Sequence, residues 1–122
     1  MGISEIIKFM CDSIHTPIAI CDIEYNIIYE NKAAVERFNH GREFVGKNIE
    51  SCFSVETLSK IYAAFEWFKE EEKNNTIFVY HNDKDNTDVY INAVRDDRMN
   101  LIAVYSYEIC RNLEAVKPFD ID

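Results

Sequence analysis

The sequence predicts an α+β domain in which a five-stranded antiparallel sheet has helices packed on one face, with an amphipathic helix preceding it. Two short apolar segments, residues 18–22 and 26–30, are separated by a turn and followed by a helical stretch. Three longer segments with strand-like alternation come after the helices. The order helix, two strands, helices, three strands is satisfied by one antiparallel sheet whose helices share a side.

The N-terminal segment, residues 3–14, has the spacing of an amphipathic helix. Pro17 should end it, because the residue before a proline avoids the helical region. The apolar positions recur every three or four residues and therefore share one stripe: Ile3, Ile6, Ile7, Met10 and Ile14. Such a stripe needs an apolar partner, which is either the sheet of the same chain or a second copy of the chain. Residues 1–15 are therefore expected to form a flanking helix.

Asn31 is expected to close the second strand and to begin the first helix of the domain. Its side chain can accept a hydrogen bond from the free amides of the first helical turn. Gly41 is a natural stop for that helix, because glycine readily adopts the left-handed conformation that ends helices. Residues 42–53 are then expected to form one or two helical turns around Gly46.

Residues 54–73 should form the longest helix. Ser54 is a suitable N-cap, and Glu56 lies in the first turn, where the helix dipole favours a negative charge. The stripe expected to be buried comprises Val55, Leu58, Ile61, Tyr62, Phe65 and Phe68. A run of glutamates at residues 70–72 then marks a solvent-exposed end.

Three strands are expected after this helix, at residues 76–81, 88–95 and 100–110, because polar turns separate segments of period two. The last strand is apolar on both faces: one face has Leu101, Ala103, Tyr105, Tyr107 and Ile109, and the other has Ile102, Val104, Ser106 and Glu108. A strand that is apolar on both faces must be covered on both. Helices cover one face, so the N-terminal helix or a second subunit should cover the other. Residues 114–122 are expected to form a loose tail.

Composition narrows the functional class. The chain of 122 residues is long enough for one domain with one core. Its formal net charge of -9 argues against nucleic acid and anionic membranes as partners, because both are negatively charged. The four cysteines form no C-x-x-C pair and no secretory signal is visible, so we expect reduced thiols in a cytoplasmic protein. The sequence has neither a phosphate-binding loop nor a nucleophile elbow, so we expect no enzymatic activity.

Five segments, taken in order, resemble the PAS sensory domain of bacterial sensors. In that family the second strand ends in an Asn that begins a helix, a Gly-Lys segment follows, and an Arg-Asp turn precedes the last strand. The corresponding segments are Pro17–Asp22 (PIAICD), Ile27–Ala34 (IIYENKAA), Phe38, Val45–Ile49 (VGKNI) and Ala93–Ile102 (AVRDDRMNLI). The resemblance covers nearly the whole chain and places the PAS domain at residues 16–113. This sequence departs from the family at Met99 and Asn100, where a turn glycine is common.

The resemblance implies a non-enzymatic signal-transduction module. A small-molecule effector would bind in the core, and the signal would pass through the outer sheet face and a homodimer contact to a transcription regulator or kinase partner. The ligand pocket would comprise Ala19, Cys21, Ile61, Phe65, Phe78, Val89, Ile91, Val104 and Ser106. The dimer contact would comprise Ile3, Ile7, Met10, Tyr105, Tyr107 and Ile109. The alternative is a homodimerisation module whose core is filled and binds no ligand.

The resemblance requires no cofactor. Flavin photosensors of the family have a cysteine directly after Gly-x-Asn, but Ile49 follows that motif here and Cys52 comes three residues later. Haem needs an axial ligand such as histidine, and the helix at residues 54–73, where haem-binding relatives carry it, has none. His81 is the remaining candidate ligand for a haem sensor.

A metal site is not expected either. Asp83, Asp85 and Asp88 are spaced loosely like a calcium loop, but the turn glycine is missing and Val94 stands where the final glutamate is needed. The cysteines and histidines lack the spacing of metal ligands. A solvated hairpin explains the acidic residues.

Overall fold

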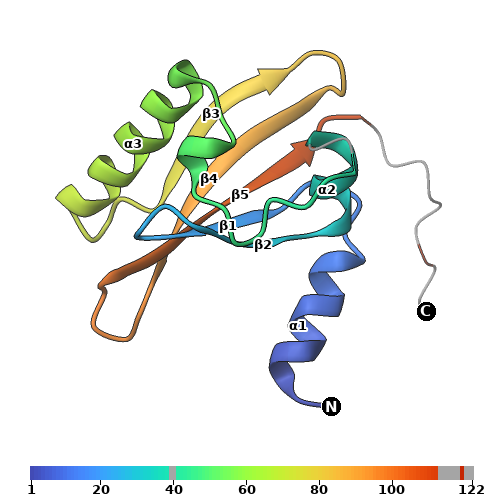
Figure 1. The fold of residues 1–122 in the computed structure, drawn as a ribbon, viewed down its shortest axis with the longest axis horizontal. Coiled ribbons are helices and arrows are strands. Elements are labelled where there is room, and N and C mark those ends of the chain that lie inside the picture. Colours follow the sequence, from blue (N-terminus) through green and yellow to red (C-terminus); the bar gives the residue numbers. More distant parts are fainter. Residues whose placement is uncertain (39–40, 113–118, 120–122) are drawn as a thin grey trace.

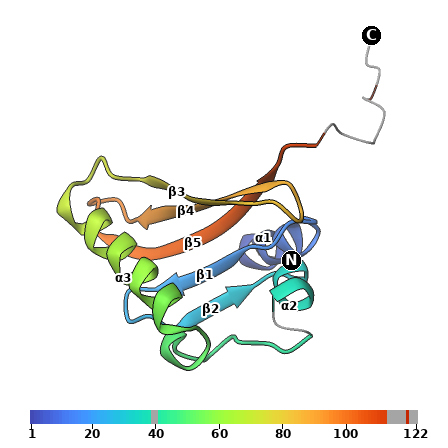
Figure 2. The same cartoon turned by 90° about the horizontal axis from the view of Figure 1, so that it is seen from above.

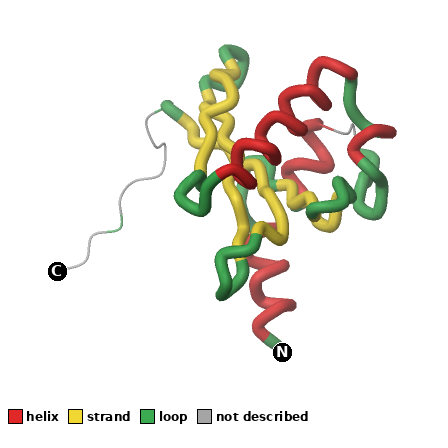
Figure 3. Tube along the Cα trace, turned by 90° about the vertical axis from the view of Figure 1, so that its left-hand side faces the viewer, coloured by secondary structure: helices red, strands yellow, loops and turns green. Residues whose placement is uncertain are grey.

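The structure is a computed structural model that describes residues 1–38, 41–112 and 119. Its strands form one antiparallel sheet in the order β2-β1-β5-β4-β3, and α2 and α3 lie over the same face of it (Figures 1 and 3). The elements are α1 (Ile3–Asp12), β1 (Ala19–Asp22), β2 (Ile27–Glu30), α2 (Lys32–Phe38), the 3-10 turn η1 (Ile49–Ser51), α3 (Val55–Glu70), β3 (Thr76–Asn82), β4 (Thr87–Arg95) and β5 (Leu101–Cys110). The predicted α+β class, the five strands and the N-terminal helix are confirmed. The expected tail, residues 114–122, lies outside the described residues apart from position 119.

Local capping signals begin the helices where the sequence predicts. The Asn31 side-chain oxygen accepts a hydrogen bond from the Ala34 amide at 2.9 Å, and the Ser54 hydroxyl accepts one from the Thr57 amide at 3.3 Å. Both pairs are the N-cap arrangement, in which a short polar side chain satisfies a free amide of the first turn. The start of α2 and the start of α3 therefore follow from the sequence.

The segment after α2 has a helical turn as predicted, but the turn follows Gly46 and does not surround it. Within residues 41–53 one helical turn forms, at Ile49–Ser51, and Gly46 precedes it in a left-handed turn with φ of +91°. The Gly46 amide donates to the Ile27 carbonyl at 2.8 Å, and the Ile27 amide donates to the Lys47 carbonyl at 2.9 Å. Backbone pairing to the free edge of β2 thus competes successfully with helix formation here.

Three β-bulges change the side-chain alternation of the sheet. The register shifts place one extra residue in β2, β3 and β5, namely Ile28, Val79 and Ile102. A bulge reverses the facing of the residues beyond it, because side chains alternate with period two. Leu101 therefore packs against the core, although the sequence pattern placed it with Tyr105 on the other face.

The core lies between α3 and the centre of the sheet, and Figure 2 shows from above how α3 lies across the strands. Its buried members are few: Ala64, Phe65, Phe68 and Val104. Tyr25 closes one end, with its ring edge-on to those of Tyr62 and Phe65 at centroid distances of 4.9 and 4.8 Å. The inner face, which we define as the sheet face beneath α2 and α3, is packed tightly around this cluster and also around Ile27, Ala34 and Ile49, which are buried outside it.

Arg95 caps the C-terminal end of α3. Its guanidinium donates to the carbonyls of Phe68, Glu71 and Asn74 at 2.8, 3.2 and 2.9 Å. These groups include carbonyls at the end of the helix, where the dipole favours a cation. One side chain thus ties the end of α3 to the sheet.

Replacing Arg95 with methionine should lower the free energy of unfolding by about 2 kcal/mol, because hydrogen bonds from a charged donor contribute about 1.5–3 kcal/mol. Urea denaturation followed by circular dichroism would measure this. Arg98→Met is the matched control, because Arg98 is exposed and the hydrogen bond of its own backbone amide to Asp96 does not involve the side chain. Equal losses in the two variants would contradict the capping role.

Candidate functional site

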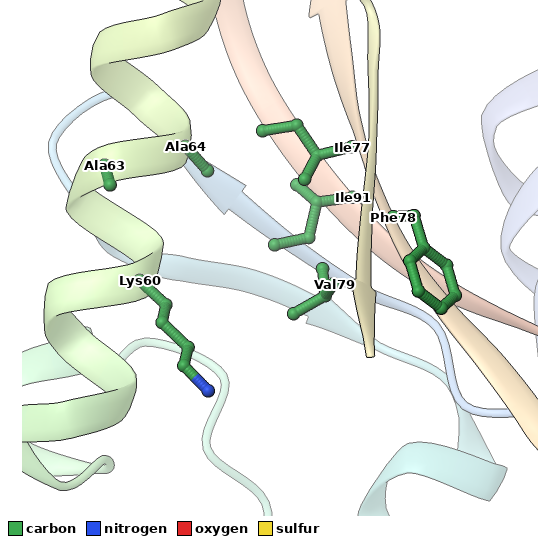
Figure 4. A pocket seen from close by; sticks show the side chains of 7 residues that line it. All are labelled: Lys60, Ala63, Ala64, Ile77, Phe78, Val79 and Ile91. Carbon is green, nitrogen blue, oxygen red and sulfur yellow. The ribbon is translucent and has the colours of Figure 1, made fainter. Parts of the chain in front are cut away.

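An open groove lies between α3 and the β3–β4 side of the inner face. Its volume is about 340 Å³. From α3 it is lined by Lys60, Ala63 and Ala64, and from the strands by Ile77, Phe78, Val79 and Ile91. Figure 4 shows Ile77, Val79 and Ile91 pointing toward the helix, whereas the Phe78 ring points away on the far side of β3.

The sequence of α3 explains why this side is open. Phe65 and Phe68 pack on the centre of the sheet, whereas the helix presents the small side chains Ala63 and Ala64 to β3 and β4. Alanine methyl groups cannot fill the distance that a leucine or phenylalanine would span. Ile77 and Ile91 consequently remain only half-buried, although they face a helix.

Lys60 is the charged residue of this lining. It projects from α3 along the groove on the side of Val79 (Figure 4). Among the residues that the structure describes, no carboxylate lies within ion-pair distance of its ammonium group. The groove thus combines an apolar surface with one free positive charge.

Eight of the nine predicted pocket residues divide into three groups. Four of them meet in the packed core: Cys21, Ile61, Phe65 and Val104. Ile91 contacts this core and also lines the groove. Ala19, Val89 and Ser106 share the inner face through strand pairing, since Ala19 and Ile91 both pair with Ser106 and Val89 precedes Ile91 by two residues. The ligand role of all these residues stays a prediction.

Phe78 does not face inward, although the alternation of residues along the predicted strand placed it there. It pairs with Tyr90, and their rings meet edge-on at 5.6 Å on the outer face. The bulge at Val79 is the reason, because it lets Ile77 and Tyr80 both face inward with Phe78 between them. The groove residues that the prediction missed are Lys60, Ala63, Ala64, Ile77 and Val79. Two of them, Ile77 and Val79, belong to the face of the predicted strand opposite to that of Phe78.

A polar cluster occupies the α2 end of the inner face. The buried Glu108 carboxylate accepts hydrogen bonds from Arg37 at 2.8 Å and from the Thr87 hydroxyl at 2.6 Å. Arg37 also lies 3.9 Å from Asp85. Burial, and then the negative charges of Glu108 and Asp85, raise the pKa of Tyr80. These groups satisfy one another, so the cluster has no free charge for a ligand.

Cys21 is part of the core rather than a reactive group. Burial, with a smaller contribution from Asp22, raises the pKa of its thiol to about 12. A thiol with such a pKa remains protonated at neutral pH and is a poor nucleophile.

The outer face carries a row of aromatic rings across β3, β4 and β5. Phe78 contacts Tyr90, Tyr90 stacks on Tyr107 at 5.5 Å, and Tyr107 contacts Tyr105 at 5.6 Å. Ile109 extends the apolar surface and is 51% exposed. We call these five residues the aromatic row. The predicted interface residues Tyr105, Tyr107 and Ile109 thus lie on one surface.

The amphipathic helix α1 does not pack on the sheet. None of its residues is buried, and Ile3 and Met10 are 70% and 55% exposed. Figure 1 shows α1 projecting away from the domain. Of the two partners considered for its apolar stripe, the sheet of the same chain is therefore eliminated in this structure.

Two side chains hold the C-terminal end of α1. The Tyr29 hydroxyl donates to Asp12 at 2.7 Å, and this hydrogen bond lowers the pKa of Asp12. The buried Asn31 side chain donates to the carbonyls of Cys11 and Thr16 at 3.1 and 2.9 Å. Because Ile20 pairs with both Tyr29 and Tyr105, Tyr29 lies on the outer face. The helix therefore leaves the domain from the same side as the aromatic row.

His81, the candidate haem ligand, faces away from the groove. Its Nδ1 lies 2.8 Å from Asp88 on the outer face. Arg111 donates to the same carboxylate at 2.8 Å, which lowers the pKa of Asp88. The structure therefore places His81 in a surface ion cluster. Within the described part of the chain, no group of three His, Cys, Asp or Glu side chains converges to hold a metal.

Solved structures assign this arrangement to a known fold. The C-terminal domain of a Streptococcus mutans protein matches with a TM-score of 0.72 at 19% identity, over 88% of this chain and 87% of that one. The PAS domain of a protein from Colwellia psychrerythraea matches with a TM-score of 0.63 at 10% identity, over 89% of this chain and 97% of that one. This chain has a PAS fold.

A further structure with the PAS arrangement is a sensory box sensor histidine kinase from Vibrio cholerae. It matches with a TM-score of 0.58 at 13% identity, over 87% of this chain and 87% of that one. No protein-family model and no curated protein matches the sequence. The described residues contain no helix with the length and apolarity to cross a bilayer.

Proposed function

We propose that this PAS domain is a non-enzymatic sensory module that binds a small-molecule effector and signals through a homodimer. The observation that carries the proposal is the open apolar groove between α3 and the β3–β4 strands. Apolar concave sites with a few polar groups are the usual form of small-molecule sites. The sensor histidine kinase of Vibrio cholerae with the same fold is consistent with a signalling role.

The groove supports ligand binding over the alternative of a filled core. A homodimerisation module that binds no ligand would have α3 packed tightly on the whole inner face. Here the core cluster has four buried residues among those that the structure describes, and about 340 Å³ beside it is open. A ligand that filled this space would change the packing of α3 against β3 and β4. An effector shifts a signalling equilibrium only if it binds the two states with different affinity.

The dimer part of the proposal rests on two apolar surfaces on the same side of the sheet, the exposed stripe of α1 and the partly exposed aromatic row. Ile3, Ile7 and Met10 on α1 follow the four-three spacing of a coiled-coil seam. The aromatic row lies on the side from which α1 leaves the domain. Contiguous apolar patches of this kind mark interaction surfaces. A second copy of the chain can cover both, because a twofold axis brings the same patch of each copy together.

Tyr105→Glu should convert the dimer into a monomer, because it places two charges against each other at the twofold contact. Light scattering during size-exclusion chromatography at several protein concentrations would measure the mass. We expect a dimer for the wild type and at least about tenfold weaker association for the variant, which corresponds to 1.4 kcal/mol. Ile7→Glu tests the α1 contribution in the same way.

Val55→Glu is the matched control for these charge substitutions. Val55 is 83% exposed and begins α3, where a negative charge suits the helix dipole. It should leave both the fold and the dimer unchanged. A wild-type monomer at high concentration, or a Tyr105→Glu variant that stays dimeric, would refute the proposed interface.

A further inference from the structure

We infer that the groove beside α3 selects an anionic amphiphile, such as a medium-chain carboxylate, whose acid group pairs with Lys60 and whose alkyl chain lies on Ile77, Val79 and Ile91. This inference rests on the proposed ligand-binding role and adds the chemical class of the ligand. The class follows from the charge, the apolar surface and the size of the groove.

The charge of the lining is opposite to that of the protein. The chain has a formal net charge of -9, yet the groove residues include Lys60 and no carboxylate. Arg37, the cation at the other end of the inner face, is already paired with Glu108 and Asp85. Of these two cations, Lys60 is the one left to meet a ligand anion, so an acidic head group should lie at its end of the groove.

The remainder of the lining suits an alkyl chain. Apart from Lys60, the side chains that face the groove are alanine, isoleucine and valine, and Phe78 borders it with its ring turned away. None of these side chains can make a hydrogen bond, so a polar tail would lose its contacts with water without replacement. A volume of about 340 Å³ lies at the lower end of the range of about 300–1,000 Å³ for small-molecule sites. The ligand is therefore small, and its part beyond the head group is apolar.

The chain contains a built-in reporter for this site. Trp67 is the single tryptophan, and it lies one helical turn beyond Ala63 on α3. Its indole is 38% exposed, so its fluorescence responds to changes in nearby solvent. Three probes have the same alkyl length but different charge: decanoate, decanol and decyltrimethylammonium. Comparing them separates the contribution of the head-group charge to binding from that of the alkyl chain. Each would be titrated below its micelle concentration into the full 122-residue chain.

We expect decanoate and decanol to bind saturably and decyltrimethylammonium to bind at least about threefold more weakly than decanol. Lys60→Gln should weaken decanoate binding about 1.5- to fivefold, as for an exposed ion pair of about 0.2–1 kcal/mol, and should leave decanol binding unchanged. Lys69→Gln is the matched control, because nine residues along α3 bring Lys69 to the opposite side of the helix from Lys60.

Ala63→Phe tests the location of the alkyl chain. Ala63 is exposed on α3, so a larger side chain there fills the groove without entering the core. Binding of decanoate and of decanol should both be lost, with an unchanged circular dichroism spectrum. Retained binding of both probes in this folded variant would overturn the location that we infer.

The outcomes separate this inference from the proposed function. If all three probes bind wild type equally and Lys60→Gln changes nothing, the inference of an anionic ligand is wrong while ligand binding in the groove stands. If no probe binds, the inferred ligand class is also wrong. The dimer experiments on Tyr105 and Ile7 then still decide the signalling interface, because neither residue lines the groove.

Discussion

Replacing Phe65 with alanine is expected to lower the free energy of unfolding by about 4 kcal/mol, the range measured for buried Phe→Ala substitutions being about 3–5 kcal/mol. Phe65 is fully buried and lies at the centre of a core with few members. Its ring meets that of Tyr25 edge-on at 4.8 Å, a contact that adds about 0.5–1.5 kcal/mol beyond burial. Domains are stable by only about 5–15 kcal/mol, so this loss is a large fraction of the total.

Urea denaturation followed by circular dichroism and Trp67 fluorescence would measure the loss. Phe78→Ala is the matched control, because it removes the same atoms from a side chain that is 53% exposed on the outer face. We expect it to cost less than about 1.5 kcal/mol, since most of the ring area is not removed from water. Equal losses at the two positions would mean that Phe78 is buried and that the β-bulge at Val79 does not form.

The second large effect is expected for Asn31→Ala, at about 3 kcal/mol. Asn31 is fully buried, and its side chain accepts from the amides of Ile18 and Ala34 while it donates to the carbonyls of Cys11 and Thr16. Alanine leaves these buried groups without partners, at about 1–3 kcal/mol for each that stays dry, and removes an N-cap worth about 1 kcal/mol. We expect water to reach some of the freed groups, so the total loss of stability stays near about 3 kcal/mol and below the sum for fully dry groups.

The same substitution should release α1 from the domain. Amide hydrogen exchange would show this, with faster exchange in residues 3–12 and around Thr16 than in the wild type. Asn31→Ser separates the two roles, because serine keeps the N-cap but is too short to reach the carbonyls of Cys11 and Thr16. It should restore about 1 kcal/mol of stability without restoring protection of α1. Unchanged exchange in α1 for both variants would contradict the anchoring role of Asn31.

Much of this fold follows from short-range patterns. Asn31 and Ser54 begin helices as their types and positions predict, because a cap depends only on the amides of the next turn. The strands 76–82, 87–95 and 101–110 lie within two residues of their predicted bounds, because alternation and polar turns are also local. The resemblance of five segments to PAS domains adds the order of the strands, which local pattern alone leaves open.

The candidate site depended on features that no local pattern contains. Phe78 was expected to face inward and Leu101 to face outward, and both orientations were wrong for the same reason. A single extra residue at Val79 or Ile102 shifts the pairing by one, and every side chain beyond the bulge changes face. Whether a strand bulges depends on its neighbour in the sheet, which can be distant in sequence.

The sequence by itself determined the elements, their caps and the charge of the protein, since these depend on neighbouring residues and on composition. Only the tertiary structure decided that Ala63 and Ala64 leave a groove over Ile77 and Ile91. It also decided that Lys60 lines this groove and that α1 projects away from the domain. Those outcomes depend on how the surfaces of distant elements fit together. Packing and sheet register are non-local, and a pattern of apolar residues specifies that a face is buried without specifying what covers it.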